Sequence, residues 1–370
     1  MSTAASRSPP PAKRARRLLR GRQASSSSSN SSLPSTTSAN PLGRRLRHCN
    51  SVEEVLPHRL CATIQAQDTD RLNSHAPFRT YGEEGQSLQE FCQDRPKLLR
   101  SYCPTPRRSI IYLQPIIDER QPTELEQLDL DFVSRFLEAF LPTMKVRVME
   151  PWRIEVPAKA TKTKAHYETT LKVGHGGEYS VAARRSRDGP SLHPQIGLND
   201  LADALLYKVP RDAWCRVGVS MLDLYEDDND DFCMGRAWGA SRVAVLGFFR
   251  YAAELGKGRP PRGVPALREA MVKTLTHEIL HCFLFDHCTR GSCLMNTTGN
   301  LHEDFEAPLW LCEECLAKLC LTLDFDVRDR YACLAEALTG EPAFAGDLQH
   351  LLARRDAARR SSPSMSQPAT

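Results

Sequence analysis

The segment from residue 277 to residue 281 reads His-Glu-Ile-Leu-His, and it constrains the fold more than any other part of the sequence. On an α-helix, residues four apart lie one turn from each other on the same face, so His277 and His281 can reach one cation. Glu278 projects from nearly the same side, where it can take a proton from water. We therefore predict a helix over residues 266–285. The apolar stripe that would pack this helix on a sheet consists of Val272, Leu275, Ile279 and Phe283.

A third histidine follows at the distance that such a site requires. His287 stands six residues after His281, so a turn at the end of the helix would bring it back to the same cation. Neutral imidazole suits zinc, and three protein ligands leave a fourth position open for chemistry. We expect a catalytic zinc on these histidines with Glu278 as general base. A downstream carboxylate, Glu303 or Glu306, is the alternative third ligand.

The cysteines indicate a second metal. Seven of the thirteen lie between Cys282 and Cys333, and the N-terminus has no apolar secretory core, so metal ligation is favoured over disulfides. Four thiolates in two closely spaced pairs fit a closed tetrahedral zinc site. We therefore expect two zinc ions per chain, one catalytic and one structural. The ligands expected for the structural ion are Cys288, Cys293, Cys312 and Cys315.

Residues 277–315 resemble the signature of the archaemetzincins, a family of the metzincin zinc peptidases. The resemblance implies three histidines and Glu278 at a catalytic zinc, four cysteines at a second zinc, and Met295 in the Met-turn beneath the first site. It extends over about residues 108–320, where short apolar segments resemble the family's first strand and its edge hairpin. It therefore implies a peptide or protein substrate, with aminopeptidase-like cleavage of short peptides as the suggestion.

One residue departs from the family pattern. Leu284 stands three residues after His281, where the archaemetzincins have glycine. Glycine suits a helix that ends abruptly with positive φ, and leucine in that conformation costs about 1 kcal/mol or more. The binding energy of zinc can offset this cost. Leu284 therefore keeps open a second hypothesis, a catalytically impaired, zinc-stabilised binding or scaffold protein.

The order of predicted strands and helices indicates an α/β (α+β) fold with a mixed, twisted sheet and a hairpin edge strand. Residues 1–50 are Ser-, Pro- and Arg-rich, and we expect them to be a disordered basic tail. Residues 51–105 form a weakly patterned extension, and residues 106–340 the metallopeptidase-like domain with an inserted loop over 157–195. Residues 341–370 are expected to be a disordered tail. The acidic run at 226–231 reads as a solvated turn rather than a calcium loop.

Charge and hydropathy limit the partners. No run of about 18 apolar residues exists, so we expect no membrane span. The net charge is +4, and residues 1–52 contain no acidic residue. The basic excess therefore lies in this N-terminal stretch, and the rest of the chain is close to neutral or acidic. We do not expect the folded domain to bind nucleic acid. The basic cluster at residues 13–17 resembles a nuclear-import signal, and the prolines at 9–11 interrupt a mitochondrial presequence helix. We expect an intracellular protein of the cytoplasm or nucleus, and the oligomeric state stays open.

Overall fold

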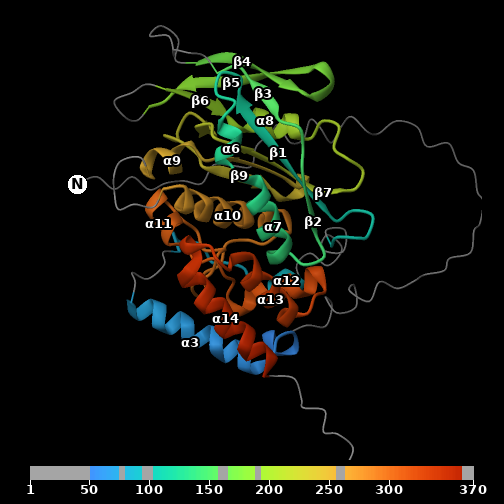
Figure 1. Ribbon diagram of the computed structural model, residues 1–370, viewed down its shortest axis with the longest axis vertical. Coiled ribbons are helices and arrows are strands. Elements are labelled where there is room, and N and C mark those ends of the chain that lie inside the picture. The colour runs from blue at the N-terminus through green and yellow to red at the C-terminus, as the bar shows by residue number, and fades with distance from the viewer. Residues whose placement is uncertain are drawn as a thin grey trace, which may run out of the picture. The chain divides into compact units, whose positions relative to one another are not determined.

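Figure 1 shows the computed structural model, which describes residues 51–74, 80–93, 103–156, 166–187, 193–255 and 263–360. Contacts divide the chain into Met1–Ala39 and Asn40–Thr370, and every described residue belongs to the second unit. The expected tails at 1–50 and 361–370 lie outside the described residues. Among the helices that are described, none has the length and apolar character needed to cross a bilayer.

A ten-stranded mixed sheet forms the centre of this unit, which confirms the predicted fold class. The strand order is β8-β6-β5-β4-β3-β1-β7-β10-β9, and β2 pairs with β1 beside β3. Strands β3, β1, β7 and β10 run parallel, whereas β9 pairs antiparallel with β10 as an edge hairpin. The strands are β1 (Ile110–Asp118), β2 (Lys145–Val148), β3 (Trp152–Ile154), β4 (His166–Val173), β5 (Gly177–Arg185), β6 (Pro194–Gly197), β7 (Ala213–Ser220), β8 (Leu224–Tyr225), β9 (Gly235–Trp238) and β10 (Val243–Gly247).

The helices cover both faces of the sheet and build a helical region below it (Figure 1). They are α3 (His58–Ser74), α4 (Leu88–Gln93), α6 (Glu124–Gln127), α7 (Leu130–Phe140), α8 (Leu198–Leu205), α9 (Phe249–Leu255), α10 (Gly263–Cys282), α11 (Leu301–Glu306), α12 (Glu313–Leu323), α13 (Val327–Leu338) and α14 (Ala345–Arg359). Short 3₁₀ turns occur at Val52–Glu54, Gly174–Gly176, Gly239–Ser241 and Pro342–Phe344.

Two hydrophobic cores lie on opposite faces of the sheet, because successive side chains of a strand point to opposite sides. In β10, Ala244 and Leu246 belong to the larger core, which α7 and α10 cover, while Val243 and Val245 belong to the smaller core under α8. Helix α10 contacts β9, β10 and α7, so the His-Glu-x-x-His segment is held against the parallel end of the sheet.

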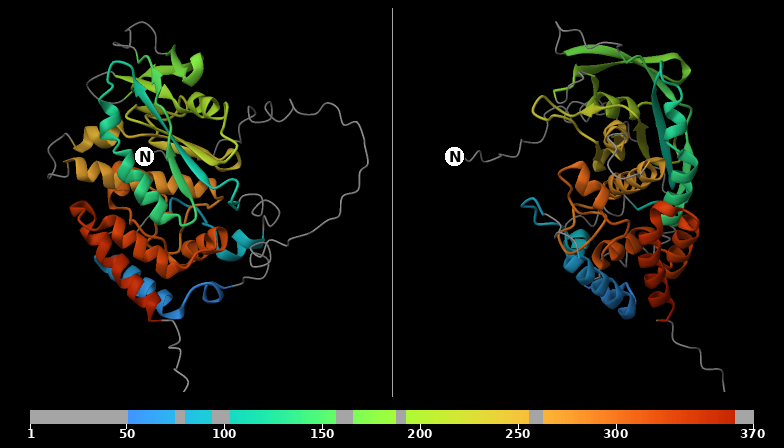
Figure 2. Two further views of the ribbon diagram at one scale, coloured as in Figure 1. Left: turned by 45° about the vertical axis from the view of Figure 1, so that its right-hand side comes forward. Right: turned by 60° about the vertical axis from the view of Figure 1, so that its left-hand side comes forward.

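The expected loop over residues 157–195 is wrong for the part that the structure describes. Strands β4 and β5 form a long antiparallel hairpin that extends the sheet, seen at the top of Figure 2. Its apolar residues occupy alternate positions, and Leu171 and Val181 are fully buried in the smaller core. The outward face is polar, so the overall composition resembles that of a loop even though the period is that of a strand.

The expected disorder after residue 341 is also wrong for residues 342–360. Helix α14 packs against α13 and α3, and α3 in turn belongs to the extension that showed no clear pattern in the sequence. Arg354 of α14 is buried, and its guanidinium donates to the carbonyl of Leu311 and to Oε1 of Gln67 at 2.6 Å each. The buried residues of this helix include Leu351, Ala357 and Ala358, and Arg354 lies among them because its hydrogen bonds satisfy the guanidinium there.

The acidic run at 226–231 is organised around a buried cation from the protein itself. The guanidinium of Arg184, only 1% exposed, donates to the carbonyls of Asp227, Asp230 and Asp231 at 2.8–3.2 Å. It also forms an ion pair with the carboxylate of Asp230 at 3.1 Å. The run is therefore a turn closed on Arg184 rather than a freely solvated one.

Candidate functional site

Helix α10 ends in a turn that directs the chain back over its own last residues. The amide of Leu284 donates to the carbonyl of His281 at 2.9 Å, and the amide of Phe285 donates to the carbonyl of Leu280 at 3.2 Å. This pair of bonds is the Schellman pattern, in which the residue after the cap takes the left-handed conformation. That residue is Leu284, with φ +66°, so the left-handed backbone expected from the family's glycine is present with a leucine.

The turn brings the three predicted histidines together. The ring centroids of His277, His281 and His287 lie 4.6, 4.9 and 5.3 Å apart, and one ring nitrogen from each lies within 4.8 Å of the others. The alternative ligands Glu303 and Glu306 are not part of this group. The third ligand-type residue of the group is therefore His287.

Hydrogen bonds leave the facing nitrogens of this triad free. Nδ1 of His277 donates to the carbonyl of Leu294 at 2.8 Å, and Nδ1 of His281 donates to the carbonyl of Phe285 at 2.7 Å. Their Nε2 atoms carry the lone pairs and lie only 3.0 Å apart. Tetrahedral zinc with bonds of about 2.0–2.1 Å places its ligand nitrogens about 3.3 Å apart. The site therefore fits a zinc ion both in donor type and in dimension.

Burial favours the neutral form of His277 and His281. Burial, followed by the neighbouring rings of His281 and His287, lowers the pKa of His277 well below its usual value. Burial also lowers the pKa of His281. A neutral imidazole is the form that binds a metal, so the environment favours ligation at neutral pH.

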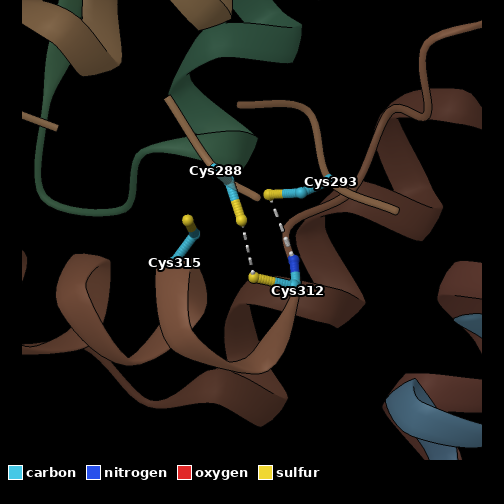
Figure 3. A group of neighbouring side chains, drawn as sticks. All are labelled: Cys288, Cys293, Cys312 and Cys315. Carbon is cyan, nitrogen blue, oxygen red and sulfur yellow. Dashed lines mark hydrogen bonds between the residues drawn. The ribbon is translucent and has the colours of Figure 1, made fainter. Parts of the chain in front are cut away.

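The four predicted cysteines form a second group next to the first. Figure 3 shows Cys312 and Cys315, at the start of α12, facing Cys288 and Cys293 from the loop that follows α10. The sulfur atoms of Cys288 and Cys312 are 3.6 Å apart, close to the roughly 3.8 Å expected between ligands of zinc with Zn–S bonds of about 2.3 Å. All four thiols are buried, so the group fits a closed structural site.

The hydrogen bonds within this group favour the ionised form of Cys288 and the protonated form of the other three cysteines. Hydrogen bonds from the other three cysteines lower the pKa of Cys288. The pKa of Cys312 and that of Cys315 are raised, first because each shares its proton with Cys288. Backbone amides of Met295 and Cys312 also donate to the sulfur of Cys293 at 3.5 and 3.4 Å. Such amide–sulfur bonds are typical of the second shell of a metal-binding thiolate.

A buried asparagine that the sequence reasoning missed holds the loop that carries Cys288 and Cys293. Asn296 donates to the carbonyls of Cys288 and Gly291 at 2.8 and 2.9 Å and accepts from the amide of Cys293 at 2.8 Å. The preceding residue, Met295, is fully buried, and its carbonyl accepts from the amide of Cys288 at 2.7 Å. The predicted Met-turn residue therefore lies in the loop that links the cysteines to the histidines.

Glu278 and the three histidines line a cleft of about 690 Å³. Strand β9 lines one wall and residues 296–301 contribute to the other. Burial raises the pKa of Glu278 to about 7, against the opposing effects of His287 and of the Ala237 amide, which donates to it. At Gly239, just after β9, a Cβ would lie 2.6 Å from the carbonyl of His281, so only glycine lets this wall approach α10.

The sequence of this chain is similar to sequences of known proteins. No protein-family model matches the chain. It is 26% identical to archaemetzincin-2 of Rattus norvegicus over 302 residues, which covers 75% of this chain and 74% of the relative. Human archaemetzincin-2 is 26% identical over 293 residues, and human archaemetzincin-1 is 28% identical over 175 residues, or 40% of this chain and 35% of the relative. The resemblance to the archaemetzincins is confirmed.

The crystal structure of archaemetzincin from Methanopyrus kandleri is also similar, with a TM-score of 0.40 and 22% identity over 60% of this chain and 99% of that one. Relative to the archaemetzincin pattern, the departure in this chain is Leu284. A further contact lies outside the pattern altogether: Nδ1 of His287 lies 2.9 Å from the carboxylate of Glu83. A separation of 204 residues gives no sequence signal that could have found it.

Proposed function

We propose that this protein is a zinc-dependent peptidase, in which His277, His281 and His287 hold the catalytic ion and Glu278 is the general base. The observation that carries the proposal is the convergence of the three imidazoles at the floor of an open cleft, with Glu278 on the same helix. A second ion at the four cysteines would fix the loop that supplies His287, because Cys288 follows it directly in the chain.

Zinc, when bound, supplies a Lewis acid that polarises a substrate carbonyl and acidifies water. Glu278 accepts the proton of the attacking water and delivers it to the nitrogen of the leaving amine. Its raised pKa of about 7 matches both steps, because such a group gains and loses a proton with little driving force near neutral pH.

Strand β9 suits the binding of an extended peptide. It pairs with β10 along one edge only, and its residues from Gly235 to Ala237 line the cleft. An extended chain can add to a free strand edge through main-chain hydrogen bonds. The Ala237 amide already donates to Glu278, so a peptide aligned on β9 would place its backbone next to the base.

Replacing Glu278 by Gln tests this mechanism. The variant should keep its zinc and lose turnover by about 100-fold or more, because the amide cannot accept the proton. Glu336→Gln, at an exposed residue of α13 away from the cleft, serves as the matched control. Unchanged peptide hydrolysis by the Glu278→Gln protein would remove Glu278 from the mechanism.

Metal analysis tests the ligands independently of turnover. Purified wild-type protein should contain two zinc ions per chain and His287→Ala about one, because the four cysteines keep theirs. A His287→Ala protein that retained both ions would support the carboxylate alternative with Glu303 or Glu306.

The family resemblance suggests aminopeptidase-like cleavage of short peptides. Short peptides with a free amino terminus should then be cleaved faster than the same peptides after N-acetylation. Equal rates on both forms would restrict the proposal to peptide hydrolysis without that specificity.

Leu284 supports one alternative, a zinc-stabilised binding or scaffold protein with impaired catalysis. Its left-handed backbone is strained by about 1–2 kcal/mol relative to glycine, which can shift the third ligand. A protein that carries two zinc ions and cleaves nothing in a broad peptide library would favour this alternative.

A further inference from the structure

A segment far from the metal motif in the sequence contacts the third histidine. Residues 80–87, here called the Glu83 strap, run alongside the turn after α10. The two carboxylate oxygens of Glu83 lie 2.9 and 3.1 Å from Nδ1 of His287, and the hydroxyl of Thr297 donates to the same carboxylate. Nδ1 therefore donates its proton to Glu83, which leaves the lone pair of His287 on Nε2.

The third histidine differs from the other two in this respect. His277 and His281 are oriented by backbone carbonyls of Leu294 and Phe285, which the motif's own loop supplies. His287 is 31% exposed and is oriented by a side chain that comes from another part of the chain. Without that partner, nothing in the motif's own loop would fix its tautomer in the same way.

The same strap also contacts the strained turn. Nε2 of Gln86 donates to the carbonyl of Leu284 at 3.3 Å and to the carboxylate of Asp286 at 3.1 Å. The amide of Asp286 returns a bond to Oε1 of Gln86 at 3.3 Å. One glutamine therefore contacts both Leu284 and Asp286 in the segment that carries the chain from His281 to His287.

The strap is itself fixed to the fold. Ser87 and Glu90 form a reciprocal capping box at the start of α4, with bonds of 2.7 and 3.1 Å between side chains and amides. Nζ of Lys318, a buried residue of α12, donates to both the carbonyl and the Oε1 of Gln86. At Gly85, φ is +75° and a Cβ would lie 2.4 Å from the hydroxyl of Thr289, so the strap fits closely here.

We propose that the Glu83 strap is a positioning element of the metal centre: Glu83 sets the tautomer and direction of His287, and Gln86 holds the left-handed turn at Leu284. The inference rests on the proposed function, because it concerns the catalytic ion. Glu83 contacts Nδ1 of His287 and acts through that ring, so it is a positioning residue and not a catalytic one. Glycine at position 284 would adopt the left-handed turn without strain. Leucine is strained there, and the strap supplies hydrogen bonds that hold the turn in this conformation.

The test is the affinity of the full chain for Co²⁺, read from visible absorption during competition with a chelator. Thiolate-to-cobalt charge transfer in the near ultraviolet reports the cysteine site. In protein whose cysteine site is first filled with Zn²⁺, the d–d bands of added Co²⁺ report the histidine site. Glu83→Ala should weaken the histidine site about 10–100-fold and leave the cysteine site unchanged. Glu83→Gln, which keeps an acceptor for Nδ1, should recover part of the loss. The control is Glu84→Ala, because Glu84 contacts Thr289 through its carbonyl rather than its side chain.

Wild-type affinity at the histidine site in the Glu83→Ala protein would overturn the inference and leave the peptidase proposal intact. A wild-type chain that binds cobalt only at the cysteines would overturn both. If Glu83→Ala does not fold, the cobalt affinities of Glu83→Gln and Glu84→Ala are compared instead. A weaker histidine site in Glu83→Gln would support the inference, and equal affinities would overturn it.

The role of Gln86 is tested by coupling. Gln86→Ala should weaken cobalt binding at the histidine site in the wild-type background and do so severalfold less in a Leu284→Gly background, where the turn forms without strain. An equal loss in both backgrounds would show that Gln86 does not act through the turn and would overturn this half of the inference.

Discussion

The amide of Phe285 donates to the carbonyl of Leu280, and this bond closes α10 around a left-handed Leu284. The side chain of Leu284 is only 8% exposed, so the strain is accompanied by buried apolar surface. Leu284→Gly relieves about 1–2 kcal/mol of backbone strain but loses packing of about 2–5 kcal/mol.

We therefore predict that Leu284→Gly is moderately less stable than wild type. Leu284→Ala should be less stable again by about 1 kcal/mol, because alanine loses the packing and keeps the strain. Chemical denaturation of the two variants measures this order. An alanine variant more stable than the glycine variant would mean that position 284 is not left-handed in solution.

The cysteine group should stabilise the fold and also support the neighbouring histidine site. Cys315→Ser replaces a thiolate by a poor zinc ligand, so we predict loss of one zinc and of at least a few kcal/mol of unfolding free energy. Cys288 is adjacent to His287, so zinc at the histidines should weaken too. Zinc content and thermal unfolding measure both effects, and Cys333→Ser, at an exposed cysteine, should change neither. Full zinc content in Cys315→Ser would contradict a four-cysteine site.

Peptide hydrolysis should depend on the ionisation of Glu278. Burial raises its pKa to about 7, and the base must be ionised to accept a proton, so kcat/KM should rise with pH toward neutrality. A bound cation favours the carboxylate, which places the rise at or below about pH 7. The pH profile of kcat/KM measures it. A profile that stays flat between about pH 5 and 8 would show that no group with the properties of Glu278 limits the reaction.

Arg184 should be essential for the stability of the turn at 226–231. Arg184→Met removes a buried cation and leaves three carbonyls and the Asp230 carboxylate without it, so we predict a loss of about 3 kcal/mol. Urea denaturation measures the loss, with Arg185→Met, the next residue of β5, as control. Stabilisation of the wild-type protein by Ca²⁺ bound at this turn would contradict the prediction, because the guanidinium of Arg184 would then not be the cation that the turn holds.

Helix α14 and the β4–β5 hairpin are the elements for which the prediction from the sequence was wrong. α14 buries Leu351, Ala357 and Ala358 together with Arg354, and the arginine is accommodated because it finds acceptors on Leu311 and Gln67. The β4–β5 hairpin has the strand period, but its polar outer face gives it the composition of a loop. The acceptors of Arg354 are distant in sequence, and local patterns carry no information about such partners, whereas the hairpin pairs with its own neighbouring strand.

The local sequence by itself predicted the residues of the two candidate metal groups that the structure brings together. Helical spacing places His277 and His281 on one face, which is local geometry, and the close spacing within each cysteine pair indicates the second group. Only the tertiary structure decided what orients these residues. Glu83 reaches His287, and Gln86 reaches the turn at Leu284, across about 200 residues of chain. Hydrogen bonds of this kind depend on how the whole chain packs, and no spacing within the motif encodes them.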